Sequence, residues 1–177
     1  MLDLGRWMAT AAMAFGFAAG THGIDVARNE FIDAKGKTVG TVTIEHFPSA
    51  TLLLIKVQGL PPGVHGIHIH AMGQCTPPAF DSAGPHFNPA NRQHGMKNPK
   101  GHHGGDLPNI TIPADGNLET QIVVQGEMTL RGENGLLDGD GASLVIHAGP
   151  DDYTTDPSGN SGARIACAVL DLPDRND

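Results

Sequence analysis

The stretch that decides the fold runs from residue 38 to residue 63 and reads TVGTVTIEHFPSATLLLIKVQGLPPG. It contains two short runs rich in Val, Ile, Leu and Thr, namely Thr38–Phe47 and Thr51–Val57, and it ends in Pro61-Pro62-Gly63. Runs of this length, bounded by Pro, Ser and Gly, are typical of strands. The final prolines must lie in a turn, because proline cannot donate to a strand ladder.

The same pattern continues outward along the rest of the chain. Glycine-centred turns at Lys35–Lys37 and Asp115–Asn117 are candidate hairpins, and no helical period is present. Many short strands with turns between them predict an all-β fold, an antiparallel sandwich or flattened barrel. Further strands are expected at Ile24–Ile32, Val64–Ala71, Ile110–Ile112, Leu118–Val124, Leu144–His147 and Ala163–Leu170, which makes eight.

Length, charge and composition exclude several classes of protein. A chain of 177 residues suits a single domain. Its 19 acidic and 11 basic residues give a formal net charge of −8, which argues against nucleic acid or an anionic membrane surface as a partner. Only 17% of the residues are charged and 24 are glycine, which disfavours a helical bundle.

The first residues are typical of a secretory leader. Trp7–Ala19 carries no charge, and the small residues Ala18-Ala19-Gly20 suit a cleavage site. We therefore expect residues 1–23 to form a leader, residues 24–177 to form one domain, and the protein to be periplasmic or otherwise exported. The run is too short for a membrane anchor, which needs about 20 apolar residues. A buried N-terminal helix is the remaining alternative.

Two long loops carry side chains suited to metal binding. Ala71–Leu107 has no strand or helix pattern, and so long a loop in a compact domain usually has a function. Metal ligation would order it in place of a hydrophobic core. A second loop, Ala148–Ala163, follows directly on His147. The first loop has no Glu but contains His86, His94, His102, His103, Asp81 and Asp106.

Gly66–His70 reads GIHIH, in which histidine and isoleucine alternate. In a strand, His68 and His70 would project from one face while Ile67 and Ile69 pack on the other. A single histidine on a strand is more often structural, but here the nearby loop supplies further ligands. Three histidines and one carboxylate suit a four-coordinate zinc site, and the loop offers such a set in His86, His94, His103 and Asp106.

Several motifs occur together in a fixed order: GIHIH at 66–70, Cys75, GPHFNP at 84–89, HG at 94–95, HGGDL at 103–107, IHAG at 146–149 and GARIAC at 162–167. In this order they resemble copper/zinc superoxide dismutase, over about residues 24–171. The leader and the second loop are similar to those of the exported bacterial branch. The spacing between Cys75 and His86 is longer than in the eukaryotic branch, so the loop there would be built differently.

The resemblance implies an eight-stranded Greek-key sandwich or flattened barrel that binds one copper and one zinc ion per chain. The implied reaction converts two superoxide anions and two protons to O₂ and H₂O₂ by copper redox cycling, with His86 supplying a proton. His86 would bridge the two ions. The implied copper ligands are His68, His70, His86 and His147, and the implied zinc ligands are His86, His94, His103 and Asp106.

The resemblance also assigns roles around the metals. Asp151 would link copper-side and zinc-side histidines, and its alternative is a solvated loop acid. His65 would be a buried structural histidine. Arg164 would lie beside copper and guide the anion, or it would only pin the loop through backbone carbonyls. Cys75 and Cys167 would form a disulfide, with free buried thiols as the alternative. The remaining histidines His22, His46 and His102 are expected at the surface.

Two other functions are alternatives to a dismutase. A non-catalytic domain that stores or delivers copper and zinc would typically lack a ligand or the loop arginine. A two-metal hydrolase would need a carboxylate base that the metal loop does not offer. The expected partner is superoxide, with no nucleic acid and no membrane span in the mature chain, and a homodimer is compatible with the sequence.

Overall fold

The structure, a computed structural model, describes residues 25–47, 50–125, 135–137 and 139–171. The predicted leader and the boundary at residue 24 lie outside these residues. Within them there is no α-helix, and no helix is long and apolar enough to cross a membrane. The strands are β1 (Asp25–Asp33), β2 (Thr38–Phe47), β3 (Ala50–Val57), β4 (Gly63–His65), β5 (Ile67–His70), β6 (Ile110–Ile112), β7 (Leu118–Gln125), β8 (Ala142–His147) and β9 (Arg164–Leu170).

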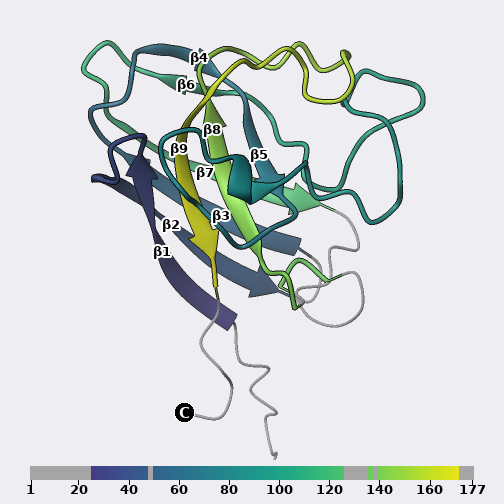
Figure 1. The fold of residues 1–177 in the computed structure, drawn as a ribbon, viewed down its shortest axis with the longest axis horizontal. Helices are drawn as coiled ribbons and strands as arrows, with labels where there is room; N and C mark the ends of the chain where they lie inside the picture. The colour runs from purple at the N-terminus through teal and green to yellow at the C-terminus, as the bar shows by residue number, and fades with distance from the viewer. Residues whose placement is uncertain (1–24, 48–49, 126–134, 138, 172–177) are drawn as a thin grey trace, which may run out of the picture.

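Seven of these strands form one curled antiparallel sheet (Figure 1), in the order β5-β8-β9-β1-β2-β3-β7. The other two strands, β4 and β6, pair with each other. The last strand, β9, returns to lie between β8 and β1, so strands distant in sequence become neighbours, as in a Greek key. This confirms the predicted all-β antiparallel architecture.

The hairpin between β1 and β2 shows how the local sequence shapes the sheet. Gly36 has φ of +76°, which glycine adopts without strain. The carboxylate of Asp33 accepts hydrogen bonds from the backbone N–H groups of Lys35, at 2.8 Å, and Lys37, at 3.0 Å. The turn predicted at Lys35–Lys37 is therefore confirmed.

The curled sheet encloses one main hydrophobic core. Buried side chains alternate with partly buried ones along β3 and much of β2, whereas every residue of β5 and β8 is buried. These two strands are therefore covered on both faces, by the core on one side and by the long loops on the other. The fully buried core side chains include Phe31, Ile44, Leu53, Ile55, Ile67, Ile69, Leu144 and Ile146.

Two details differ from the sequence-based expectation. The strand predicted at Val64–Ala71 is divided at Gly66, which gives nine described strands instead of eight. A Cβ atom on Gly66 would lie 2.9 Å from Ser161 Cβ, so the second loop packs against the chain at this point. The turn at Asp115–Asn117 exists, but it is not a hairpin, because β6 pairs with β4 and β7 pairs with β3.

The two long loops lie against each other beyond β5 and β8 (Figure 1). The backbone N–H of Lys97 in the first loop donates to the carbonyl of Tyr153 in the second, at 3.0 Å. The first loop contains one 3₁₀ turn, Asp81–Ala83, where no regular structure was expected. This arrangement brings the histidines of the first loop and Asp151 of the second loop to the outer faces of β5 and β8.

Candidate metal centre

Strands β5 and β8 provide the base of the candidate site. Ile67 and Ile69 are fully buried in the main core, so the intervening His68 and His70 project from the other face of β5. His147 is the last residue of β8, which pairs with β5. The first loop adds His86 through an isolated antiparallel bridge to His70.

Four histidines form one buried cluster, which we call the copper cluster after the ion that the resemblance implies for it. Their ligand atoms lie within 4.8 Å of one another. Each histidine uses one ring nitrogen in a hydrogen bond and leaves the other buried without a partner. Buried polar atoms are normally hydrogen-bonded, so four unpartnered nitrogens facing one point indicate a metal site. They are His68 Nδ1, His70 Nε2, His86 Nε2 and His147 Nε2.

A second cluster, which we call the zinc cluster after the ion that the resemblance implies for it, lies on the other side of His86. The Nδ1 atoms of His86, His94 and His103 lie 2.9, 3.0 and 3.1 Å from the same atom, Asp106 Oδ1. Three imidazoles and one carboxylate form the kind of donor set that zinc binds in closed sites. His86 thus presents Nδ1 to the zinc cluster and Nε2 to the copper cluster.

Burial controls the charge of the copper cluster in the metal-free chain. Burial, together with the neighbouring histidines, lowers the pKa of His70 to about 2, of His86 to about 4 and of His147 to about 3. These imidazoles are therefore neutral at neutral pH. A neutral imidazole has the lone pair that a metal ion needs.

The zinc cluster has the opposite electrostatic character. Burial would lower the pKa of His94, but hydrogen bonds to Asp106 and Asp151 outweigh burial and raise this pKa to about 9. Burial would raise the pKa of both carboxyl groups, yet their hydrogen bonds to histidine hold these pKa values well below the usual range. Both aspartates are therefore ionised and available to a cation.

Asp151 links the two clusters. Its Oδ2 lies 2.9 Å from His68 Nε2, and its Oδ1 lies 3.0 Å from His94 Nε2. Asp151 is only 3% exposed, so it is not a solvated loop acid. Asn109, which the sequence analysis missed, holds it in place: the Asn109 amide donates to the Asp151 carbonyl and accepts from the Asp151 N–H, both at 2.9 Å.

Comparison with known proteins identifies the family. Residues 38–170 match the protein family Copper/zinc superoxide dismutase (SODC). The chain belongs to the copper/zinc superoxide dismutase family.

Individual relatives of the superoxide dismutase family support this assignment. Superoxide dismutase (Cu-Zn) 2 of Aquifex aeolicus (strain VF5) is 43% identical over 146 residues, which cover 81% of this chain and 85% of the relative. A solved structure of a SOD-like protein from Bacillus subtilis is 41% identical with a TM-score of 0.75, covering 82% and 99%. Cu/Zn superoxide dismutase from Brucella abortus is 31% identical with a TM-score of 0.66, covering 83% and 100%.

The dismutase fold ties its first long loop to β9 in two ways. A disulfide joins Cys75 to Cys167 on β9, as predicted, so neither of the two cysteines is free. Arg164 at the start of β9 donates from Nη1 to the Phe80 carbonyl at 2.6 Å and from Nη2 to the Gly84 carbonyl at 2.8 Å. The Gly84 carbonyl also lies 2.8 Å from His70 Nδ1. Arg164 therefore orders the loop beside the copper cluster.

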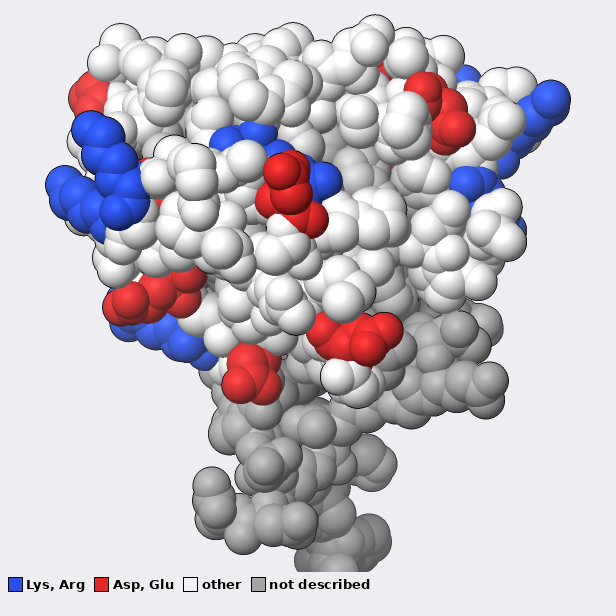
Figure 2. Space-filling model, viewed as in Figure 1, with Lys and Arg blue, Asp and Glu red and all other residues white. Residues whose placement is uncertain are grey.

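Arg164 also lines a surface pocket of about 470 Å³ with Asp81 and Gly162. Partial burial lowers the pKa of Arg164, and the nearby Asp81 carboxylate opposes this shift. On the face shown in Figure 2, basic side chains lie at both edges and in a small recessed patch near the middle, beside an acidic group.

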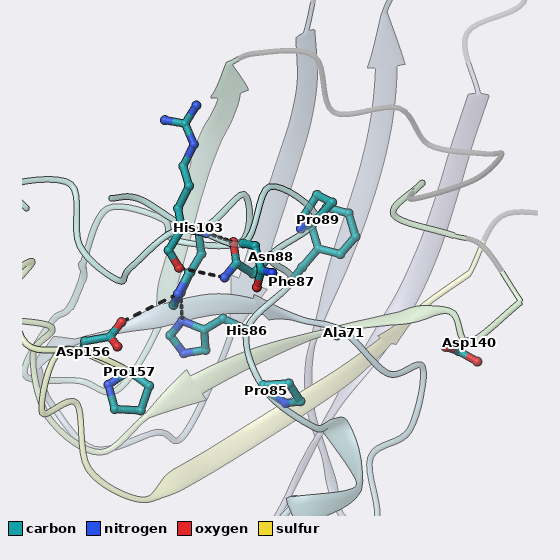
Figure 3. Close-up of a pocket in the computed structure, with 12 residues that line it drawn as sticks. Ala71, Pro85, His86, Phe87, Asn88, Pro89, His103, Asp140, Asp156 and Pro157 are labelled. Carbon is teal, nitrogen blue, oxygen red and sulfur yellow. Dashed lines mark hydrogen bonds and ion pairs between the residues drawn. The ribbon is translucent and has the colours of Figure 1, made fainter. Parts of the chain in front are cut away.

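A second pocket, of about 530 Å³, opens beside the zinc cluster (Figure 3). His86 and His103 form part of its wall, and Asp156 and Asp140 lie at different sides of it. His103 therefore has one edge toward the pocket, although its side chain is only 7% exposed.

Two of the remaining predicted histidines, His65 and His102, lie where the sequence suggested, whereas His46 is not fully exposed. His65 is buried, with Nδ1 2.8 Å from the His147 carbonyl and Nε2 2.9 Å from the Pro61 carbonyl, so it is structural. His102 is exposed and does not join either cluster. His46 is half-buried and contacts Thr51 Oγ1 at 2.9 Å, far from the clusters in the sheet. His22 lies outside the described residues.

Proposed function

We propose that this chain is an exported superoxide dismutase that binds one copper and one zinc ion. Copper would be held by His68, His70, His86 and His147, and zinc by His86, His94, His103 and Asp106. The observation that carries the proposal is the set of four unpartnered, buried imidazole nitrogens beside a three-histidine, one-carboxylate cluster that shares His86. A storage or delivery domain would not need the complete set together with Arg164.

When bound, copper supplies one-electron redox chemistry, and zinc, which has no redox chemistry, supplies charge. The chain's own residues do the rest. His86 Nε2 would carry a proton only while it is not bound to copper, and it would then donate that proton toward peroxide. Asp151 fixes the rings of His68 and His94 through their Nε2 atoms. The core covers one face of β5 and the loops the other, so all four histidines of the copper cluster are buried.

Metal analysis of the purified protein tests the proposal directly. We expect one copper and one zinc ion per chain, an electron paramagnetic resonance signal of nitrogen-ligated Cu²⁺, and rapid loss of superoxide in a stopped-flow assay. The four unpartnered nitrogens are the physical reason for a nitrogen-only copper environment. A protein that holds both ions but does not consume superoxide would be a metal carrier, and a protein that binds zinc alone would contradict the copper assignment.

Export and oxidation are expected together. The apolar stretch Trp7–Ala19 predicts removal of the leader, and a disulfide such as Cys75–Cys167 persists in an oxidising compartment. Mass spectrometry of the protein from the envelope of its native cell should give an N-terminus near residues 19–24. The mass should also be two hydrogens below that of the dithiol. An intact Met1, or thiols that react without reductant, would rule out this proposal.

A further inference from the structure

Asp156 on the second loop faces the zinc cluster from the side of the pocket in Figure 3. Its Oδ1 accepts a hydrogen bond from the backbone N–H of His94 at 2.6 Å. The same oxygen lies 3.9 Å from His103 Nε2. The Asp156 side chain is 48% exposed, whereas that of His103 is 7% exposed. Asp156 therefore touches two members of the zinc cluster and the solvent at once.

The chemistry of a metal-bound imidazole gives this contact a role. A histidine that binds a metal through Nδ1 carries its proton on Nε2, and that N–H usually donates to a carboxylate or carbonyl that fixes the ring. His94 has such a partner in Asp151, and His86 turns its Nε2 to the copper cluster. His103 is the remaining member, and Asp156 is the carboxylate that its Nε2 faces.

The distance between the two groups is compatible with this role. Hydrogen bonds from nitrogen to oxygen are about 2.7 to 3.2 Å long, so the carboxylate needs to approach by about 1 Å. A half-exposed side chain in a loop can make that shift, whereas Asp106 and Asp151 are buried and already bonded to their histidines. The bond to the His94 N–H keeps Asp156 within reach.

We propose that Asp156 is a positioning residue of the zinc site, the carboxylate that orients His103 through Nε2 and ties the second loop to the zinc cluster. This inference rests on the proposed function, since it requires zinc at His103 Nδ1. It adds to that function a residue outside the predicted ligand set, placed by the fold 53 positions from His103 and 62 positions from His94 in the sequence.

The test compares zinc affinity in variants of the full chain, measured by competition with a chromophoric chelator after removal of metals and reconstitution. Asp156→Asn keeps an oxygen that can accept the His94 N–H but removes the charge that faces His103. We expect about a tenfold weaker zinc affinity, the lower end of the effect of such outer carboxylates, with copper content unchanged. Asp156→Glu should recover part of the loss.

Asp140→Asn is the matched control, because Asp140 lines the same pocket and its loss changes the net charge equally. It should leave zinc affinity unchanged. Co²⁺ bound in place of zinc gives visible absorption bands that report on ligand geometry, and these bands should shift only in the Asp156 variant.

The outcomes separate this inference from the function. Equal losses of zinc affinity in Asp156→Asn and Asp140→Asn would mean that the affinity depends on the total charge of the pocket. That result would overturn the role of Asp156. Tight zinc binding by the wild type with no loss in Asp156→Asn would overturn that role alone. A wild-type chain that takes up no zinc would overturn both the inference and the proposed function.

Discussion

Replacing His70 by alanine should remove copper and lower the rate of superoxide dismutation by more than about a hundredfold, because even outer partners of metal ligands typically contribute 10- to 100-fold. His70 belongs to the copper cluster alone, so zinc binding should persist. His103→Ala should show the reverse, losing zinc and keeping copper. His86→Ala should weaken both, since His86 is the one member that the two clusters share. Metal content per chain and stopped-flow rates would measure all three.

His102→Ala is the matched control for these variants. His102 is the sequence neighbour of His103, but it is exposed and lies outside both clusters. Its loss should leave metal content and activity unchanged. Circular dichroism would verify that each variant retains its strands. If His70→Ala keeps both copper and activity while folded, the copper assignment is wrong.

The strands could be predicted from sequence because their signal is local. β2 and β3 are short runs rich in Val, Ile, Leu and Thr between turn residues, and the structure places these strands within one residue of the expected limits. The division at Gly66 had no local signal. It arises because Gly66 N–H donates to the Gly149 carbonyl and Gly66 O accepts from the His147 N–H, both at 2.8 Å, and these partners are distant in sequence.

The sequence also did not predict how strands pair when they are not consecutive in the chain. Asp115-Gly116-Asn117 has the composition of a hairpin turn, and Gly116 has φ of +75°. A turn fixes the local direction of the chain but not the partner of the strand that follows it. Here β7 finds its partner in β3, through the pair Val57 and Leu118.

The candidate site likewise has residues that the sequence predicts and residues that it does not. The histidines could be found because metal ligands occur in short motifs, such as GIHIH at 66–70. The residues that position these ligands do so mostly through a hydrogen bond between one side chain and a backbone atom that is distant in sequence. Asn109 bonds to the backbone of Asp151, and Asp156 bonds to the N–H of His94, across 42 and 62 positions. An asparagine or aspartate in a loop can have many other structural roles, so the residue type alone does not predict the role of Asn109 or Asp156.

Arg164→Ala should lower the second-order rate with superoxide by about tenfold, which corresponds to about 1.4 kcal/mol of lost attraction. The chain has a net charge of −8, so attraction of an anion must be local. The second loop, Ala148–Ala163, has no Lys or Arg. The candidates for attracting the anion are therefore Arg164, which directly follows this loop in the sequence, and Lys97 and Lys100 in the first loop. Copper content should not change, because His70 Nδ1 keeps its own contact with the Gly84 carbonyl. Arg164→Glu should be slower still.

Salt and a lysine variant separate guidance of the anion from support of the loop, since Arg164 also bonds to two loop carbonyls. Raising salt from 0.01 M to 0.15 M shortens the Debye length from about 30 Å to about 8 Å. If the charge guides superoxide, wild type should slow with salt more than Arg164→Ala, and Arg164→Lys should recover much of the rate. If the arginine only pins the loop, Arg164→Lys should lose stability and activity together, since lysine cannot reproduce the two-pronged geometry. Equal salt slopes in wild type and Arg164→Ala would then exclude a guiding role.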